Sequence, residues 1–252
     1  MRLLTVLFLF CSLGYAEVVY QGFSLIPHIV DGGGIQTELT LTNLDDTPST
    51  YTVWFWDDNG NRLSIATSPG NSDYFVTLAP HARLSFRTAG TAGTQTQGWA
   101  SITTTGNVGA SAIFRVSVGP WTGSEVVIPA DPTRNNRFSL AFDQTDSAVI
   151  ALALVNPQDD PIAVAMTFRG EDGGVIVTDT FNMGSRTHRA IVTTSSYPAT
   201  AGKRGTIEIS TSSSYLGVLA LRFGPSAISY VVPLVSHTWS NIDNPCWGCW
   251  DY

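Results

Sequence analysis

An internal repeat is the feature of this sequence that most restricts its fold. Residues 35–63 align with residues 148–176 at a constant offset of 113, without a gap. The matched pairs are Leu39 and Leu152, Leu41 and Leu154, Asn43 and Asn156, Asp46 and Asp159, Pro48 and Pro161, Phe55 and Phe168, and Gly60 and Gly173. Further landmarks recur in the same order: Phe23-Ser24-Leu25 with Phe138-Ser139-Leu140, Gly98 with Gly205, Gly109 with Gly217, and Val127-Ile128-Pro129 with Val231-Val232-Pro233. The repeat predicts two copies of one structural unit, and the first copy carries its surplus mainly in residues 64–73.

Each copy has the pattern of antiparallel β-structure. In residues 37–43, Leu39 and Leu41 alternate with polar residues, which predicts a strand with one apolar face. The strand at residues 52–57 runs into Asn59-Gly60, a pair that favours a tight hairpin turn. Further strands are expected at Tyr74–Leu78, Arg83–Arg87, Trp99–Thr104, Ala110–Val116 and Glu125–Ile128.

About seven short strands in each copy are typical of a β-sandwich of the immunoglobulin or fibronectin III type. The sequence therefore predicts an all-β protein of two tandem Ig-like antiparallel sandwiches. Antibody-type domains are excluded because the chain lacks their Cys…Trp…Cys pattern.

The N-terminus has the pattern of a secretory signal peptide. A short positive start precedes the apolar run Leu3–Leu13, and Gly14 and Ala16 supply small residues before a cleavage point. The run is shorter than the about 20 residues that span a bilayer, and we predict no transmembrane segment. We expect a secreted, extracellular or periplasmic protein, with a signal peptide at 1–16, sandwiches at 17–130 and 138–236, a linker at 131–137 and a tail at 237–252.

Several motifs carry a resemblance to known proteins: the run Pro27–Gly34, the Leu-Thr-Asn of residues 41–43, the Asp-Asp-Asn-Gly hairpin of residues 57–60, and Gly98-Trp99-Ala100. Together they resemble an uncharacterised class of secreted bacterial proteins built from paired Ig-like sandwiches. The resemblance covers most of residues 23–234. It implies the fold and an extracellular location, and it brings no catalytic residues.

Composition and charge exclude three classes of protein. The chain has 13 Lys and Arg against 20 Asp and Glu, a net charge of −7, and only 13% of its residues are charged while 43% are hydrophobic. Disordered chains combine low hydrophobicity with high charge, and nucleic-acid binding requires a basic stripe, so neither class fits. The abundance of Thr, Ser, Val and Gly argues against a helical bundle.

No catalytic motif stands out, and we predict no enzyme activity, catalytic residue, cofactor or metal. The histidines are scattered in the sequence, and His81 and His188 precede equivalent strands, which favours a shared structural role. Residues 57–61 have the oxygen-rich character of a calcium loop. A hairpin turn accounts for every residue of this segment, and we favour the turn.

Trp54 and Trp56 are the candidate ligand-binding residues. At strand spacing they share one face while Phe55 takes the other, and Thr167 and Arg169 replace them in the second copy, which indicates an outward face. Exposed tryptophans in a row can stack sugar rings. The alternative is that they pack against the other sandwich or a long loop.

The tail contains Cys246 and Cys249, the two cysteines that follow the signal peptide. In an oxidising compartment we expect a local disulfide between them. A bond between chains is the alternative, whereas a thioredoxin-type redox role lacks its βαβ context and a zinc site lacks four ligands.

These observations predict an exported, non-enzymatic surface, matrix or adhesion module whose partner is a protein or polysaccharide at the cell surface. A carbohydrate-binding module that uses Trp54 and Trp56 is the main alternative, and an enzyme with a site built from distant loops is a weaker one. The sequence makes no prediction about oligomeric state.

Overall fold

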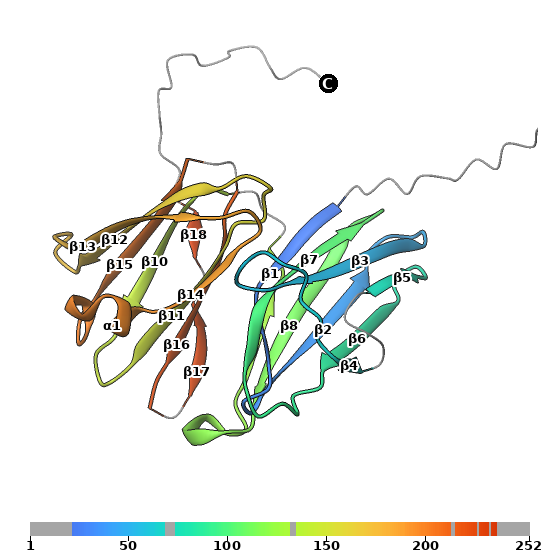
Figure 1. Ribbon diagram of the computed structural model, residues 1–252, viewed down its shortest axis with the longest axis horizontal. Coiled ribbons are helices and arrows are strands. Elements are labelled where there is room, and N and C mark those ends of the chain that lie inside the picture. Colours follow the sequence, from blue (N-terminus) through green and yellow to red (C-terminus); the bar gives the residue numbers. More distant parts are fainter. Residues whose placement is uncertain are drawn as a thin grey trace, which may run out of the picture.

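Two β-sandwiches lie side by side in this protein (Figure 1). A computed structural model describes residues 22–68, 74–131, 135–212, 215–225, 227–231 and 233–235. Within them, four antiparallel sheets form the two halves, which confirms the predicted all-β fold of tandem sandwiches. The predicted signal peptide and tail, including Cys246 and Cys249, lie outside the described residues.

The first half pairs a sheet of order β1-β7-β3-β5 with a sheet of order β4-β6-β2-β8-β9. Its elements are β1 (Gly22–Asp31), β2 (Ile35–Asn43), β3 (Ser49–Trp56), β4 (Thr67–Ser68), β5 (Tyr74–Leu78), β6 (Arg83–Thr88), β7 (Thr96–Thr104), β8 (Val108–Val116), the 3-10 helix η1 (Gly119–Trp121) and β9 (Glu125–Pro129). All five of the further strands expected from the sequence are present, and no end differs from its expected position by more than three residues.

The second half pairs a sheet of order β13-β12-β15-β10-β18 with a sheet of order β14-β11-β16-β17. Its elements are β10 (Arg137–Asp143), β11 (Val149–Val155), β12 (Ile162–Gly170), β13 (Val175–Met183), β14 (His188–Val192), α1 (Thr193–Ser196), the 3-10 helix η2 (Pro198–Thr200), β15 (Arg204–Thr211), β16 (Gly217–Phe223), β17 (Ile228–Val231) and β18 (Leu234–Val235).

The repeat in the sequence is a repeat in topology. When β10–β17 are matched in chain order to β1–β3 and β5–β9, both halves have the same strand order, and β4 and β18 are additions at sheet edges. The register agrees as well, because Leu39 lies opposite Ala112 and Leu152 lies opposite Ala220. Phe55 and Phe168 are fully buried in their respective cores, as predicted.

Asn43 and Asn156 show why the repeated positions carry these residues. Both side chains are fully buried at the end of a strand. The Asn43 amide donates to the carbonyls of Thr47, Leu78 and Ala79. In the second copy, the amide of Asn156 donates in the same way to the carbonyls of Asp160 and Gly184. Each asparagine therefore ties two loops together where backbone groups lack a strand partner.

Replacing Asn43 or Asn156 with alanine is expected to lower the free energy of unfolding by about 1–3 kcal/mol each, because buried carbonyls lose their donors. Urea denaturation of both variants measures the change, with Thr40→Ala on the outer face of β2 as the control. Equal stability of the asparagine variants and the control would contradict this role.

Gly98 and Gly205 are a second matched pair, and close approach of the backbones explains why both copies have glycine at this position. A Cβ atom at Gly98 would lie 1.9 Å from the carbonyl oxygen of Trp56, and one at Gly205 would lie 1.9 Å from that of Arg169. The backbones of neighbouring strands approach too closely there for any side chain. Glycine is thus required at this point in both sandwiches.

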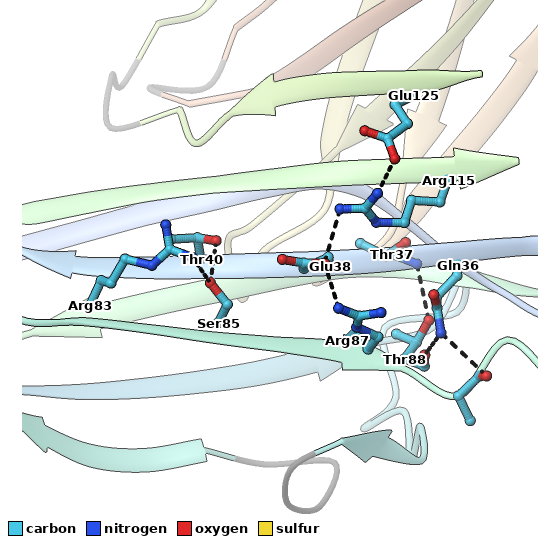
Figure 2. Close-up of polar contacts among 11 residues, drawn as sticks. Gln36, Thr37, Glu38, Thr40, Arg83, Ser85, Arg87, Thr88, Arg115 and Glu125 are labelled. Atoms are coloured by element: carbon cyan, nitrogen blue, oxygen red, sulfur yellow. Dashed lines mark hydrogen bonds and ion pairs between the residues drawn. The ribbon is translucent and has the colours of Figure 1, made fainter. Parts of the chain in front are cut away.

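The outer face of the β2 sheet is polar in the first half (Figure 2). Glu38 lies between Arg87 and Arg115, at 3.4 and 3.2 Å, and Arg115 also pairs with Glu125. These ion pairs cross four neighbouring strands, from β6 through β2 and β8 to β9. This is the surface of a sheet that faces solvent.

The equivalent face is apolar in the second half. The polar residues Glu38, Thr40 and Thr42 of β2 correspond to Ala151, Ala153 and Val155 of β11, and Ser111, Ile113 and Arg115 of β8 correspond to Leu219, Leu221 and Phe223 of β16. Ala153, Leu219 and Leu221 are buried and join the core cluster of the first half. The two sandwiches therefore pack through a continuous apolar contact between this face and β1, and we call this contact the junction.

Candidate functional site

Trp54 and Trp56 lie on the outer face of the β1-β7-β3-β5 sheet, whereas Phe55 points into the core, as the strand pattern predicts. Trp54 is 38% exposed and Trp56 is half-buried. Trp56 donates its indole N–H to the hydroxyl of Ser101 at 3.1 Å. The two residues therefore differ: Trp54 faces solvent, and Trp56 is held against its own sheet.

Trp99 on β7 connects this face to the second sandwich. It lies opposite Trp56, with stacked rings 5.8 Å apart, and is only 1% exposed. Its indole N–H donates to the backbone carbonyl of Arg186 at 2.8 Å. Val155 and Tyr215 of the second half cover it. The alternative that Trp54 and Trp56 pack against the other sandwich therefore holds in part for Trp56, which packs on the cluster of Trp99, Val155 and Tyr215.

Two arginines stack on the exposed side of the same face. The guanidinium carbon of Arg62 lies 3.6 Å from the ring centre of Trp54 and 4.9 Å from that of Trp56. The guanidinium carbon of Arg186, from the second half, lies 4.7 Å from the Trp56 ring. Such cation–π contacts hold a guanidinium flat against a ring.

These side chains line an open groove of about 430 Å³ at the edge of the junction. We call it the junction groove, and its lining combines indole rings with groups of both charges. The lining residues are Phe23, Trp54, Trp56, Arg62, Trp99, Ser101, Pro157, Asp159 and Arg186. Asp159 pairs with Arg186 at 2.5 Å and is 75% exposed. The groove thus takes residues from both sandwiches, so its shape depends on the junction.

The Asp-Asp-Asn-Gly segment forms the expected turn. The Asp57 carboxylate accepts the backbone N–H groups of Asn59 and Asn61, and Gly60 has a φ of +82°. The turn also docks on the second sandwich, since a Cβ at Gly60 would lie 2.3 Å from the carbonyl oxygen of Ser185. The hairpin therefore acts as a connector between the halves, a role its sequence did not reveal.

Asp58 of this turn begins a partly buried polar network across the junction, in which the His188 side chain is fully buried and that of Asp58 is 42% exposed. Its carboxylate accepts the Nδ1–H of His188 at 2.7 Å and the side-chain amide of Gln97 at 2.8 Å. Nε2 of His188 lies 3.0 Å from Nδ1 of His28, with the two rings stacked. Because a carboxylate only accepts, His188 carries its proton on Nδ1, and its Nε2 accepts from His28 when both rings are neutral.

Burial sets the ionisation of this Asp58–His188–His28 network. Desolvation, strengthened by His188, lowers the pKa of His28 from 6.5 to about 3, although Asp58 acts in the opposite direction. Burial alone would raise the pKa of Asp58, but the hydrogen bonds from His188 and Gln97 outweigh it and lower that pKa. At neutral pH the network therefore holds a carboxylate and a neutral His28.

The shared structural role expected for His81 and His188 is wrong, because His81 pairs with Asp46 and His188 pairs with Asp58. The backbone N–H of Asn43 donates to the carbonyl of Ala82, and that of Asn156 donates to the carbonyl of Thr187, so Ala82 corresponds to Thr187. His188 therefore lies two residues beyond the position that corresponds to His81. His81 instead corresponds to Arg186, and both have a positive φ, of 57° and 56°. Each also pairs with the matching aspartate, Asp46 or Asp159. His188 has a separate role at the junction.

Sequence reasoning found Trp54 and Trp56 but missed the residues that surround them. Arg62 follows the hairpin of the same copy and bridges to Trp56. Arg186 reaches the groove, and His188 meets Asp58 and His28, only because the two halves pack together. The available signal was the loss of polar residues from the outward positions of β11 and β16, since strands buried on both faces read as continuous apolar runs.

Within the described ranges, no group of three or more His, Cys, Asp or Glu residues could hold a metal ion. The same part of the chain contains no helix long and apolar enough to cross a membrane. No protein-family model matches the chain, and neither does any curated protein.

Proposed function

We propose that this chain is an exported interaction module, without enzymatic activity, that acts at a cell surface or in a matrix and meets its partner at the junction groove. The observation that carries the proposal is that Trp56 and Trp99 of one sandwich and Arg186 of the other build one open groove. Because the junction is fixed, the groove is already ordered, and binding does not lose conformational entropy in forming it. The resemblance to secreted proteins of paired Ig-like sandwiches supports the exported location.

Carbohydrate binding is the second candidate, and the exposure of Trp54 favours it. An indole ring beside a groove is a stacking surface for a sugar ring. The junction groove also offers polar partners for hydroxyl groups, namely Ser101 and Asp159. This candidate specifies the partner as a polysaccharide, whereas the broader proposal also admits a protein.

Binding of the purified chain to surface material from the cells that export it tests both candidates. We expect retention on this material, and we expect Trp54→Ala to weaken retention about tenfold or more, the effect of losing one well-placed aromatic contact. The matched control is Thr167→Ala, which alters the equivalent position in the second sandwich.

Treating the material before binding separates the two partners. Retention that survives protease but not glycosidase treatment supports a polysaccharide partner, and the reverse supports a protein partner. Equal retention of Trp54→Ala and the unaltered chain contradicts use of the groove. Absence of retention on untreated material contradicts the proposal that the chain is an interaction module.

A further inference from the structure

We propose that the charged outer face of the first sandwich prevents a second copy of this chain from docking on it head to tail. The contact that it prevents is a repetition of the junction, in which the second sandwich docks on the first. Three observations carry this inference. The junction joins two different surfaces of the repeated unit, each surface has a free counterpart elsewhere in the molecule, and both counterparts carry ion pairs where the junction is apolar.

The junction is a contact between unlike surfaces. The second sandwich contributes the outer face of β11 and β16, from which Leu219 and Leu221 join the core cluster of the first half. The first sandwich contributes β1 and β7, whose Leu25 and Trp99 belong to one buried cluster with Val155. A contact between two different surfaces leaves one example of each surface free, so identical units would continue to dock, as a fibre or a ring.

The free counterpart of the β11–β16 face is the polar outer face of the first sandwich, which we call the polar face (Figure 2). In the second sandwich, Phe223 and Ile228 pack against the core cluster of the first half, across the junction. The strand registers place charged residues of the first sandwich at the equivalent positions; the pairs are Glu38 and Ala151, Arg115 and Phe223, and Glu125 and Ile228. Glu38 and Arg115 lie 3.2 Å apart, and Arg115 also pairs with Glu125. An ion-pair network thus stands where apolar residues form the junction.

The free counterpart of the β1–β7 surface lies on the second sandwich and is polar as well. The strand registers give the equivalent pairs as Leu25 and Ser139, Trp56 and Arg169, and Trp99 and Thr206. Arg169 pairs with Glu208 at 3.0 Å, and Arg204 lies 3.8 Å from Glu171. These four charged residues line an open groove of about 380 Å³. Both free surfaces therefore differ from the junction in the same way.

The hairpin of the second sandwich shows that this surface is uncovered. At the junction, a Cβ atom at Gly60 would lie 2.3 Å from the carbonyl oxygen of Ser185. Gly173 is the equivalent glycine, with a φ of +79° against +82°. A Cβ atom at Gly173 would meet no other part of the described chain within 4 Å. The turn is therefore available in the second copy for the contact that it makes in the first.

A second copy docked in this way would bring two ion-paired surfaces together. The charges of both surfaces already have partners within their own sandwich, so removing their water would cost free energy without supplying new partners. The junction itself buries Trp99 and Leu221 and gains from the hydrophobic effect. The polar face thus opposes the series of contacts that the repeat would otherwise allow, and the chain remains a unit of two sandwiches.

Two triple variants test this inference by exchanging residues between the copies. The face variant gives the polar face the residues of the second sandwich, and it carries Glu38→Ala, Arg115→Phe and Glu125→Ile. The tryptophan variant gives the second sandwich the residues of the β1–β7 surface, and it carries Ser139→Leu, Arg169→Trp and Thr206→Trp. We expect the unaltered chain and each variant to be monomeric alone, and a mixture of the two variants to form a one-to-one complex. Analytical ultracentrifugation should show association in the mixture at least about tenfold tighter than in either variant alone.

A matched control places similar apolar side chains away from both surfaces. It carries Thr178→Ala, Thr180→Phe and Asn182→Ile, at exposed positions of β13. Because β13 has no part in the junction, this control should not associate with the tryptophan variant.

A cross-link reports whether the complex repeats the geometry of the junction. Arg83 and Glu171 are the equivalents of His188 and Asp58, whose side chains meet at 2.7 Å across the junction. Adding Arg83→Cys to the face variant and Glu171→Cys to the tryptophan variant should therefore give a disulfide between these two positions in the mixture. Mass spectrometry of the digested complex identifies the linked peptides.

Thermal unfolding verifies that each variant is folded, and Arg115→Phe with Glu125→Ile replaces the face variant if the triple substitution unfolds the chain. Folded variants that stay monomeric when mixed would overturn the inference, because the ion pairs would then not be what prevents docking. Equal association of the control with the tryptophan variant would also overturn it, since an apolar addition at any position would then suffice. Self-association of the chain that carries Arg83→Cys and Glu171→Cys alone, with a disulfide between them, would show that the polar face admits a second copy.

Discussion

Replacing Trp99 with alanine is expected to lower the free energy of unfolding by about 3–5 kcal/mol, the range for truncation of a large buried aromatic residue. Trp99 is 1% exposed and belongs to one buried cluster with Leu25, Val155 and Tyr215. The substitution also leaves the carbonyl of Arg186 without its indole donor. The cost therefore combines an unfilled cavity with a lost hydrogen bond at the junction.

The same substitution should separate the unfolding of the two halves. In the intact chain, Ala153 and Leu219 of the second sandwich belong to the core cluster of the first, so the halves should unfold together. Differential scanning calorimetry of Trp99→Ala should show two transitions where the unaltered chain shows one. Circular dichroism in urea gives the change in free energy.

Two variants serve as controls for this experiment. Trp54→Ala removes a tryptophan from the exposed part of the same sheet and should cost less than about 1 kcal/mol. Trp99→Phe retains a ring and removes the indole donor, and it should cost about 1–3 kcal/mol. A loss below about 1 kcal/mol for Trp99→Ala, or two transitions in the unaltered chain, would refute the role of Trp99 in joining the halves.

The sandwich fold could be predicted because its signals are local. Alternation places Leu39 and Leu41 on one face, and the offset of 113 carries that pattern to Leu152 and Leu154. Asn43 and Asn156 repeat because each satisfies carbonyls of its own loops. Each of these interactions is contained in one copy, so the sequence of one copy specifies it.

The junction was not predicted, although part of its signal was present. The run Val149–Val155 lacks the polar residues that alternate in β2, and the run Gly217–Phe223 has one charged residue, Arg222. Apolar residues at inward and outward positions indicate a strand covered on both faces. The sequence analysis used only the inward positions of these strands and made no prediction for their outer face.

The polar contacts of the junction are harder to predict from the sequence than its apolar strands. His28 and His188 are 160 positions apart, and Asp58 and His188 are 130 apart. Their contacts depend on how two complete sandwiches dock, and no local pattern encodes that geometry. The same reason explains why Trp56 was placed on the correct face while Arg186 beside it was missed.

Acid is expected to destabilise the protein through His28. In the folded chain burial lowers the pKa of His28 to about 3, against 6.5 when unfolded. Between these values the unfolded state binds the additional proton, so stability is complete above about pH 6.5 and falls as the pH decreases toward 3. One such group contributes at most about 1.4 kcal/mol per pH unit, or up to about 3 kcal/mol between pH 7 and pH 4.5. Asp58, whose pKa is also lowered, adds to the loss only below about pH 4.

Urea denaturation at several pH values from 7 to 4.5 measures this effect. The slope of the unfolding free energy against pH gives the number of protons taken up on unfolding. His28→Gln removes the titrating group and should lower that number in this window by up to about one. The variant is less stable at pH 7, because His188 loses its stacked partner, so the slope rather than the absolute stability is compared. His81→Gln, at a surface position away from the junction, is the control for the loss of one histidine. A slope unchanged by His28→Gln would mean that another group senses acid, and that the Asp58–His188–His28 network holds the halves together without responding to pH.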